Sequence, residues 1–394
     1  MIATWTLSTL LVIAAAGFAL GRARALASAG GDIRALHSLP GHYGWATALF
    51  TLVPALLLLA LLTIARPLAP AGAIAVVALA LAGLAFLMRR IAPGLRARQT
   101  VERGVLTLLV LAACVAIATT AGIVLSILLE TRNFFAQYDW REFFLSATWA
   151  PRFKGGSDLG VLPLLWGTLY VSLIALVFAV PVGLFAAIYM AEYAGRRLRA
   201  IVKPGIEVLA GIPTIVYGLF ALMTVGPMLR DYFALPLGLG ASGSSVMTAG
   251  LVMGIMLIPF VSSLSDDIIA QVPQSLRDGS LALGATRSET IRQVILPAAL
   301  PGIVGAVLLA ASRAIGETMI VVLGAGAAAK LSLNPFEAMT TITVKIVSQL
   351  TGDSDFAAPE TLVAFALGLT LFTITLCLNV LALAIVRKYR EQYE

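Results

Sequence analysis

The chain has 394 residues, of which 60% are hydrophobic and 12% are charged, and its mean hydropathy is +0.96. This composition excludes an ordinary soluble domain and indicates a polytopic membrane protein. The formal net charge of +7 requires no nucleic-acid partner, because the basic residues gather in the connections between apolar stretches.

Nine apolar stretches are candidates to cross the bilayer, whose hydrocarbon core needs roughly 17–25 residues per helix. The sequence therefore predicts an all-α transmembrane fold, a polytopic helical bundle with about nine spans. The expected spans cover residues 3–21, 44–64, 72–88, 104–129, 161–191, 206–228, 245–264, 298–324 and 361–386.

The basic residues of the connections predict the orientation. Alternate connections carry 18 and 8 Lys and Arg residues, and the remaining one of the 27 is Arg313. Because the richer set faces the cytoplasm, we expect a multi-pass protein of a bacterial inner membrane, in contact with lipid, with its N-terminus outside and its C-terminus cytoplasmic. The first 20 residues contain no basic residue and no convincing cleavage site follows, which favours a retained helix over a removed signal peptide.

Two parts follow from this pattern. Residues 1–100 supply three helices of unknown role, and residues 101–394 form a six-helix unit with both ends on the cytoplasmic side. In the outside loop 130–160, the aromatic stretch "NFFAQYDWREFF" indicates either interfacial anchors or a surface that recognises a partner.

The cytoplasmic segment 265–302 reads as two short helices. Pro273 stands near a helix start, and Gly284 stands where a helix would end in a left-handed residue. Pro297 and Pro301 are expected to mark the end of the second helix and the start of the next span.

The second of these helices carries a predicted capping box. The Thr286 side chain can cap the helix while Glu289, three residues later, reaches back to the backbone of Thr286. The turn at Gly284–Ala285 should therefore be rigid.

This segment resembles the cytoplasmic signature of ATP-binding cassette (ABC) importer permeases, an "EAA" triplet followed at set spacing by Gly, an aliphatic residue and Leu-Pro. It departs from that pattern where "DGS" replaces "EAA". The resemblance implies a coupling helix that contacts a separate ATPase subunit. The residues it assigns to coupling are Asp278, Gly279, Ser280, Gly284, Ala285, Thr286, Glu289 and Pro297, and Val294 and Leu296 complete the spacing.

Four stretches in order resemble the permeases of phosphate-specific ABC importers, and "GETM" favours a PstC-like subunit. They are "LAGIPTIVYGLFA", "GIMLIPFVSSLSDD", "SLALGATRSETIRQVILPAALPGI" and "SRAIGETM". The resemblance covers residues 101–394 and implies a six-helix permease core preceded by three extra helices.

The implied function is ATP-driven import of inorganic phosphate by alternating access. The implied partners are a PstA-like second permease, two cytoplasmic PstB-like ATPases and an extracytoplasmic PstS-like phosphate-binding protein. Since the chain has no phosphate-cradling G-x-x-x-x-G-K-[ST] stretch, ATP hydrolysis is expected in a partner and not in this chain. A permease for molybdate or phosphonate, and a sensor or regulatory subunit of phosphate signalling, remain alternatives.

No metal site or cofactor is expected. His37 and His42 are five residues apart and do not supply the ligand count of a closed site, while Cys114 and Cys377 fall inside expected spans.

Arg313 and Glu317 raise the sharpest question about function. Arg313 lies twelve residues after Pro301, about 18 Å along a helix, and a lone Arg at that depth costs at least roughly 2.5–3.5 kcal/mol. Glu317 lies one turn further and can pair with it, although Arg before Glu is the less favourable order. The two residues are candidates for the substrate pathway, where Arg313 would offer forked donors to an oxyanion, for a gate, or for a bridge that only packs helices.

Overall fold

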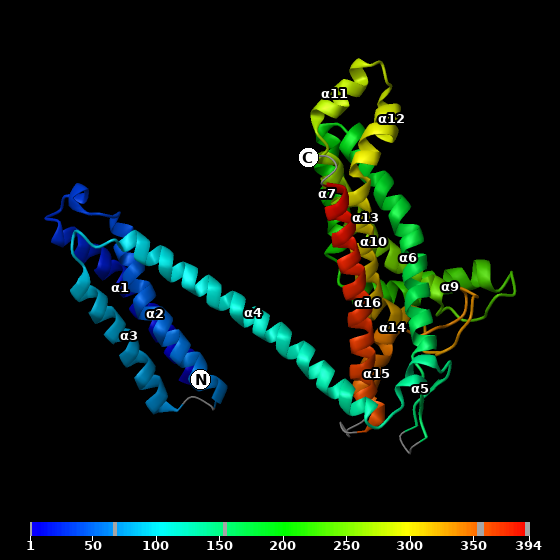
Figure 1. Cartoon of the computed structure of the whole chain (residues 1–394), viewed down its shortest axis with the longest axis horizontal. Coiled ribbons are helices and arrows are strands. Elements are labelled where there is room, and N and C mark those ends of the chain that lie inside the picture. The colour runs from blue at the N-terminus through cyan, green and yellow to red at the C-terminus, as the bar shows by residue number, and fades with distance from the viewer. Residues whose placement is uncertain (1, 66–68, 153–155, 353–357, 391–394) are drawn as a thin grey trace. The chain divides into compact units, whose positions relative to one another are not determined.

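The computed structural model describes residues 2–65, 69–152, 156–352 and 358–390, most of them in helices (Figure 1). Within these ranges, eight helices are long and apolar enough to cross a membrane, or nine if one sharply bent pair is a single span, so the predicted fold class is confirmed. Arg66 and Lys154, which contributed to the predicted orientation, lie outside the described residues.

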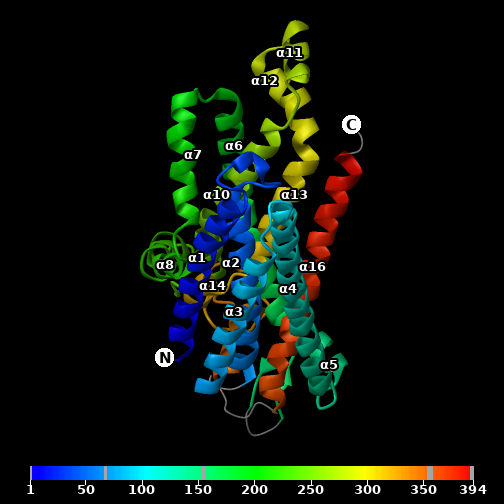
Figure 2. The ribbon, with the colours of Figure 1, turned by 90° about the vertical axis from the view of Figure 1, so that its left-hand side faces the viewer.

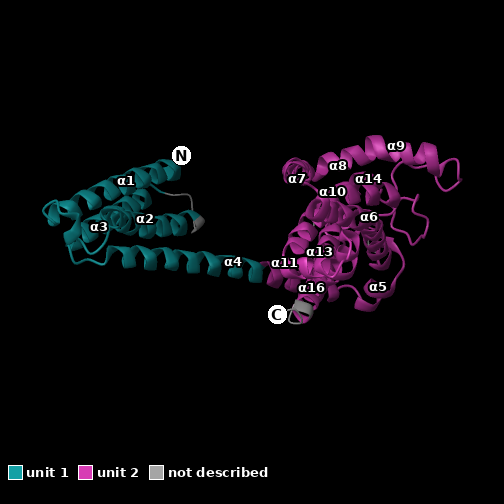
Figure 3. Ribbon diagram, turned by 90° about the horizontal axis from the view of Figure 1, so that it is seen from above, with its two compact units in different colours: residues 1–122 teal, residues 123–394 magenta. Residues whose placement is uncertain are grey.

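The chain divides into two compact units, residues 1–122 and 123–394 (Figure 3). The division falls inside one long helix, α4, so this helix belongs to both units. The sequence places the start of the permease domain near residue 100, close to where α4 begins, and that boundary remains our proposal.

Unit 1 is a three-helix bundle whose backbones approach closely at small residues. A Cβ on Gly21 would lie 2.2 Å from Thr47 Oγ1, and a Cβ on Gly83 would lie 2.2 Å from the carbonyl oxygen of Phe50. Glycine is therefore required at both contacts, as is common where membrane helices pack. The elements are α1 (Ile2–Ser28), the short turn η1 (Ile33–Ala35), α2 (Pro40–Ala65), α3 (Pro70–Arg90) and the first part of α4 (Ala97–Phe135).

Unit 2 is a helical bundle with one small antiparallel hairpin. Its long helices α6, α10, α13 and α16 run alongside one another (Figures 1 and 2). After α4 its elements are α5 (Trp140–Leu145), β1 (Trp149–Ala150), β2 (Asp158–Leu159), α6 (Leu162–Ile188), η2 (Tyr189–Tyr193), α7 (Arg196–Ala210), α8 (Thr214–Phe220), η3 (Ala221–Val225), α9 (Gly226–Leu229), η4 (Arg230–Ala234), α10 (Val246–Ala270), α11 (Gln274–Ala282), α12 (Arg287–Thr290), η5 (Ile291–Ile295), α13 (Leu296–Ile315), α14 (Met319–Gly324), α15 (Ile342–Gly352) and α16 (Pro359–Arg390).

The core of unit 2 lies between α6 and α10. Gly250 and Gly254 of α10 sit against Ile174 and Phe178 of α6, leaving no room for larger residues. Buried side chains from α8 and α14 complete this core, including Tyr217 and Ile320. α11 and α12 lie at one end of the unit, and α5 and α15 lie at the opposite end (Figures 1 and 2).

The expected span at 206–228 is sharply bent and not one continuous helix. α7 ends at Ala210, and the helical stretch from Thr214 to Ala234 leaves it at 84°. Pro213 adopts an extended conformation with ψ 136° and has no N–H to continue the helix, so the chain turns there. From α8 to η4 the chain then runs across the long helices of the unit (Figures 1 and 3).

The expected continuous span at 298–324 is also wrong. α13 ends at Ile315, and α14 begins at Met319 after a break at residues 316–318. The Glu317 carboxylate accepts hydrogen bonds from the backbone N–H groups of Thr318 and Met319 at 3.1 and 3.0 Å. The Glu317 carboxylate therefore caps the start of α14. A turn stands here in place of the continuous helix that the sequence predicted.

The prolines of the cytoplasmic segment do not separate two helices. The helix runs from Arg287 to Ile315 without interruption, so the expected boundary at Pro297 and Pro301 is wrong. The wide π-helical turn η5 precedes α13, and Pro297 occupies the first turn of α13, where its missing N–H is tolerated. A proline at this position is therefore compatible with a continuous helix.

The aromatic residues of loop 130–160 mostly pack into a buried apolar cluster that they share with α6, α15 and α16. Phe134 and Phe143 are fully buried, with ring centroids 5.5 Å apart, and contact each other edge to face. Trp140 and Phe144 are exposed by 56% and 40%, so these two keep the predicted role of anchors or recognition groups open.

Candidate functional site

The turn between α11 and α12 has the predicted conformation. Gly284 adopts a φ of +84°, which favours glycine, and the N–H of Ala285 donates to the carbonyl of Ser280 at 3.2 Å. α11 begins directly after Pro273. The left-handed helix end predicted from the sequence is confirmed.

The predicted capping box is also confirmed. The N–H of Thr286 donates to Glu289 Oε2 at 2.8 Å, and the N–H of Glu289 donates to Thr286 Oγ1 at 3.4 Å. The Ser280 and Thr290 hydroxyls lie 3.0 Å apart and join α11 to α12. The elbow is therefore held by its own hydrogen bonds.

The outer surface of this elbow is exposed. Asp278 and Gly279 face solvent on α11, and the Leu283 side chain next to Gly284 is 91% exposed. Leu281, near the end of α11, is also 48% exposed, so this end of the elbow presents more than one apolar side chain. Pro297 lies apart from these residues, in α13.

The contact that anchors the elbow was not predicted from the sequence. Arg277 of α11 forms an ion pair with Glu192 in η2, and its Nη2 donates to the carbonyl of Ile269 at 2.6 Å. The side chains of Arg277 and Glu192 are only 13% and 9% exposed. Because the partners are 85 residues apart in the chain, no local pattern predicts this contact.

A second ion cluster joins α7 to α10. The carboxylate of Asp266 is fully buried and accepts from Arg199 Nη2 at 2.9 Å and from Lys203 Nζ at 2.8 Å. Lys203 also reaches Asp267 at 3.1 Å. The paired acids at the end of "SLSDD" were the available signal, since an apolar helix carries such charges only where they find partners.

Arg313 lies in the last turn of α13 and is exposed on the surface of this chain. Its guanidinium carbon lies 5.7 Å from the ring centroid of Phe260 on α10, a cation–π distance. Next to it, Ser312 donates to Asn379 Oδ1 of α16 at 2.9 Å. A guanidinium exposed at this point must meet water, an anion or a partner chain, because lipid would not solvate it.

The expected pairing of Arg313 with Glu317 is wrong. Among the ion pairs of the described residues, none joins these two side chains. The reason is that the helix ends between them and Glu317 turns toward the backbone of α14. Spacing by four residues brings side chains together only where the helix continues.

The turn after α13 is also held by α15. Thr343 Oγ1 donates to the carbonyl of Glu317 at 2.9 Å. Two residues on, Lys345 is half-buried, and its Nζ lies 3.4 Å from the carbonyl of Ala327. Burial lowers the pKa of Lys345, so α15 carries a partly desolvated cation near this turn.

Unit 2 has a groove of about 1210 Å³ between α10, α11, α13 and α16. Ile268, Leu276, Leu309 and Leu383 make its walls apolar. Asn379, which also lines it, already accepts from Ser312. The groove therefore offers few polar groups for binding an anion.

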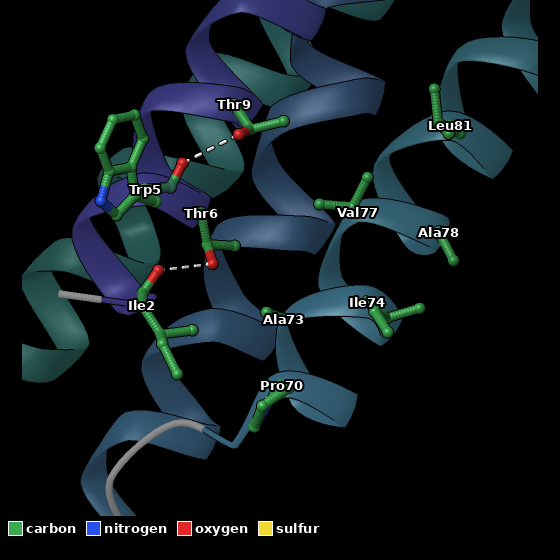
Figure 4. Close-up of a pocket in the computed structure, with 10 residues that line it drawn as sticks. All are labelled: Ile2, Trp5, Thr6, Thr9, Pro70, Ala73, Ile74, Val77, Ala78 and Leu81. Atoms are coloured by element: carbon green, nitrogen blue, oxygen red, sulfur yellow. Dashed lines mark hydrogen bonds between the residues drawn. The ribbon is translucent and has the colours of Figure 1, made fainter.

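Unit 1 has a smaller apolar groove of about 700 Å³ between α1 and α3 (Figure 4). The hydroxyls of Thr6 and Thr9 donate to carbonyls of their own helix, those of Ile2 and Trp5, at 2.8 and 2.9 Å. Both hydroxyls are therefore already satisfied within α1.

Within the described parts of the chain, no three His, Cys, Asp or Glu side chains come together in a way that could hold a metal ion. Cys114 and Cys377 are exposed thiols without a disulfide. His37 contacts the neighbouring Ser38 hydroxyl at 3.4 Å.

Comparison with known proteins agrees with this architecture. Permeases that are named phosphate transport system permease protein PstC are similar to the chain. That of Mycobacterium tuberculosis, PstC 1, is 39% identical over 251 residues, covering 59% of this chain and 74% of the relative. That of Mesorhizobium japonicum is 34% identical over 254 residues, covering 61% and 76%.

Solved structures show the same fold at low identity. A bacterial alginate ABC transporter, in complex with its alginate pentasaccharide-bound periplasmic protein, aligns with a TM-score of 0.51 and 17% identity. The alignment covers 74% of this chain and 96% of that one. At this identity the likeness concerns the fold alone.

Two family models match the chain. Residues 7–75 match a family described as phosphate ATP-binding cassette transporter. Residues 179–391, more than half of the chain, match the family described as binding-protein-dependent transport system inner membrane component. The chain therefore belongs to the family of inner-membrane components of binding-protein-dependent transport systems.

Proposed function

We propose that this chain is the PstC-like permease subunit of an ATP-driven importer of inorganic phosphate. The observation that carries the proposal is the family match over residues 179–391, because that range contains both the exposed elbow and Arg313. The phosphate permeases among its relatives favour phosphate as the substrate. The match of residues 7–75 to a phosphate transporter family favours a place for unit 1 in the same complex.

The partners in this proposal are a PstA-like second permease, two PstB-like ATPases and a PstS-like binding protein. α11 and α12 lie on the cytoplasmic side, with the C-terminus, and the N-terminus lies outside. Asp278, Gly279 and Leu283 form the exposed surface that an ATPase subunit would cover. ATP binding would move this elbow and switch access to the pathway from outside to inside.

In the pathway, Arg313 would contact the anion directly. Its guanidinium makes no ion pair with Glu317, so its forked donors remain available to two oxygens of a phosphate. Glu317 has a different role in this proposal: it caps α14 and thereby sets the turn that follows Arg313. Phe260 supports the guanidinium from one side.

The test is uptake by proteoliposomes that hold the complex assembled with its four partner chains. Labelled phosphate should be taken up in an ATP-dependent way, and molybdate and phosphonate, tested in the same vesicles, should not. Arg313→Ala should reduce phosphate uptake by about tenfold to a hundredfold, because a charge-assisted hydrogen-bond pair to the anion is lost. Phosphate uptake by Arg313→Lys should lie between that of the wild type and that of Arg313→Ala, since lysine keeps the charge but lacks the forked donors.

Recovery of the intact complex is the control for each variant. Normal phosphate uptake by Arg313→Ala would overturn the role of Arg313. Uptake of another oxyanion in preference to phosphate would overturn the substrate while leaving the permease assignment in place.

A further inference from the structure

The anchor of the elbow has a geometry suited to passing on movement. The Arg277 guanidinium joins three elements: it lies on α11, pairs with Glu192 in η2, and donates to the carbonyl of Ile269 in the last turn of α10. Arginine suits such a place, because its planar fork holds two acceptors in fixed directions. The Ile269 carbonyl also accepts from the backbone N–H of Val272 at 3.2 Å, and because a carbonyl oxygen has two lone pairs it can accept the bond from Arg277 as well.

The partner element η2 is a π-helical turn that follows α6 directly. Turns of this kind widen a helix by one residue and occur often at functional sites. Both residues at its end face the elbow: Glu192 pairs with Arg277, and the Tyr193 ring lies 5.4 Å from the guanidinium carbon of Arg287. α11 and α12 are thus both attached to the end of α6.

The Arg277–Glu192 pair lies in a largely buried place. Ala187, Ile269, Ile291 and Ile295 form a buried apolar cluster beside it. Removing one partner of a buried ion pair leaves the other charge uncompensated, so the pair resists separation. Movement of α11 should therefore carry η2 and the end of α10 with it.

The Asp266 cluster extends this connection to the bent helix. Asp266 lies one turn before Ile269 on α10 and binds Arg199 and Lys203 of α7. At the other end of α7, the Tyr217 hydroxyl donates across the bend to the carbonyl of Leu209 at 2.8 Å. Contacts thus run from the elbow through α10 and α7 to α8, which packs on α14.

We propose that the Arg277–Glu192 pair is the positioning contact through which displacement of the α11–α12 elbow is passed to α6 and α10. Arg277 touches neither the substrate nor ATP in this proposal; it acts by holding three elements in register. The proposal rests on the transport function above, and it adds a residue pair outside the set assigned from sequence spacing.

The experiment measures the number of anions transported per ATP hydrolysed by the full reconstituted complex. Arg277→Gln should keep ATP hydrolysis within about twofold of wild type while uptake falls about tenfold, within the usual range of coupling between sites. In Arg277→Lys the number of anions transported per ATP should fall about threefold, because one ammonium cannot bind Glu192 and the Ile269 carbonyl with the geometry of the guanidinium fork. Arg292→Gln, an exposed arginine of the same segment, is the matched control and should transport like wild type.

The double variant Arg277→Glu with Glu192→Arg separates positioning from general damage. It should recover a substantial part of the ratio lost by either single charge reversal. A ratio equal to wild type in both Arg277→Gln and Arg277→Lys would overturn the proposal, as would parallel losses of uptake and ATP hydrolysis. If Arg277→Gln does not assemble, Arg277→Lys and the double variant decide the matter.

Failure of the proposed substrate gives a different result. The wild-type complex would then transport another oxyanion, and the transport ratio of each variant is measured with that anion. The two outcomes are therefore read from different samples: the substrate from the wild type, and the positioning role from the variants.

Discussion

Unit 2 contains two helix junctions that are built in different ways. The elbow at residues 283–286 is held by groups within ten residues of one another, such as Ser280 with Ala285 and Thr286 with Glu289. The turn at residues 316–318 combines a local cap by Glu317 with a bond from Thr343, 26 residues further on. The elbow can therefore keep its shape when its surroundings move, whereas the second turn depends on the position of α15.

This difference suits the tasks proposed for the two junctions. A contact surface for an ATPase has to be stiff, because a soft elbow would absorb the displacement. A turn next to a transport pathway has to change, and one that is held partly by a distant hydroxyl can respond to movement of another element.

The largest effect is expected for Glu317→Ala. The substitution removes the acceptor of two backbone N–H groups, a loss of about 1–2 kcal/mol in local stability, and should reduce phosphate uptake at least about tenfold. Glu317→Gln keeps an acceptor oxygen and should retain more uptake than Glu317→Ala. Equal losses in both variants would show that the negative charge, and not the cap, is what transport needs. Glu207→Gln, an exchange at an exposed carboxylate of α7, is the control.

Gly284→Ala tests the elbow. An alanine held at a φ of +84° costs about 1–2 kcal/mol, and since a Cβ at this position would have no neighbour within 4 Å, the cost is purely conformational. Amide hydrogen exchange of residues 283–290 in the full complex should become faster. Gly279→Ala, inside α11 with equally open space, should slow exchange or leave it unchanged. Faster exchange in both would show that the effect is not conformational.

The local chemistry of the elbow explains why it could be predicted. Gly284, Thr286 and Glu289 satisfy the helix ends within their own stretch, so residue type and spacing determine the structure. The breaks at residues 211–213 and 316–318 could not be located in the same way. An apolar stretch with a Gly or Pro is compatible with a continuous helix, and only tertiary contacts decide whether the helix ends.

The same reasoning applies to the charged residues. Arg313 and Glu317 stand out in an apolar stretch of the sequence, but their predicted contact required a continuous helix, whereas α13 ends at Ile315. Arg277 was overlooked although it adjoins the predicted coupling residues, because its partner Glu192 lies 85 residues earlier. Residue type thus drew attention to the charges, and the fold determined their partners.

A smaller effect is expected for Thr343→Val, which removes the hydrogen bond from α15 to the turn at residues 316–318. The carbonyl of Glu317 loses one hydrogen bond, a change of about 1 kcal/mol, and phosphate uptake should fall about threefold to fivefold. Thr351→Val on the same helix is the matched control, because the Thr351 hydroxyl bonds only within α15. Identical uptake by the two variants would mean that α15 does not influence the turn.

The smallest effect concerns Lys345 on α15, a helix too short to span the membrane. Burial lowers the pKa of Lys345 below its ordinary value, so between these two values the unfolded chain binds a proton that the folded chain does not. The folded state should therefore gain stability as the pH rises through this window. Lys345→Met removes the buried charge and should raise the thermal unfolding temperature at neutral pH, with the difference from wild type shrinking at alkaline pH.

Lys388→Met is the control for this pH dependence. Lys388 is an exposed cation on α16, so its removal should leave the dependence of the thermal unfolding temperature on pH as it is in the wild type. A Lys345→Met variant less stable than wild type at neutral pH would mean that the ammonium contributes more through its 3.4 Å contact with the Ala327 carbonyl than burial costs it. In that case Lys345 would hold α15 in place, and movement of α15 would not be what changes the turn at residues 316–318. A more stable variant would instead show that α15 carries a desolvated charge close to the turn, which an arriving anion would stabilise.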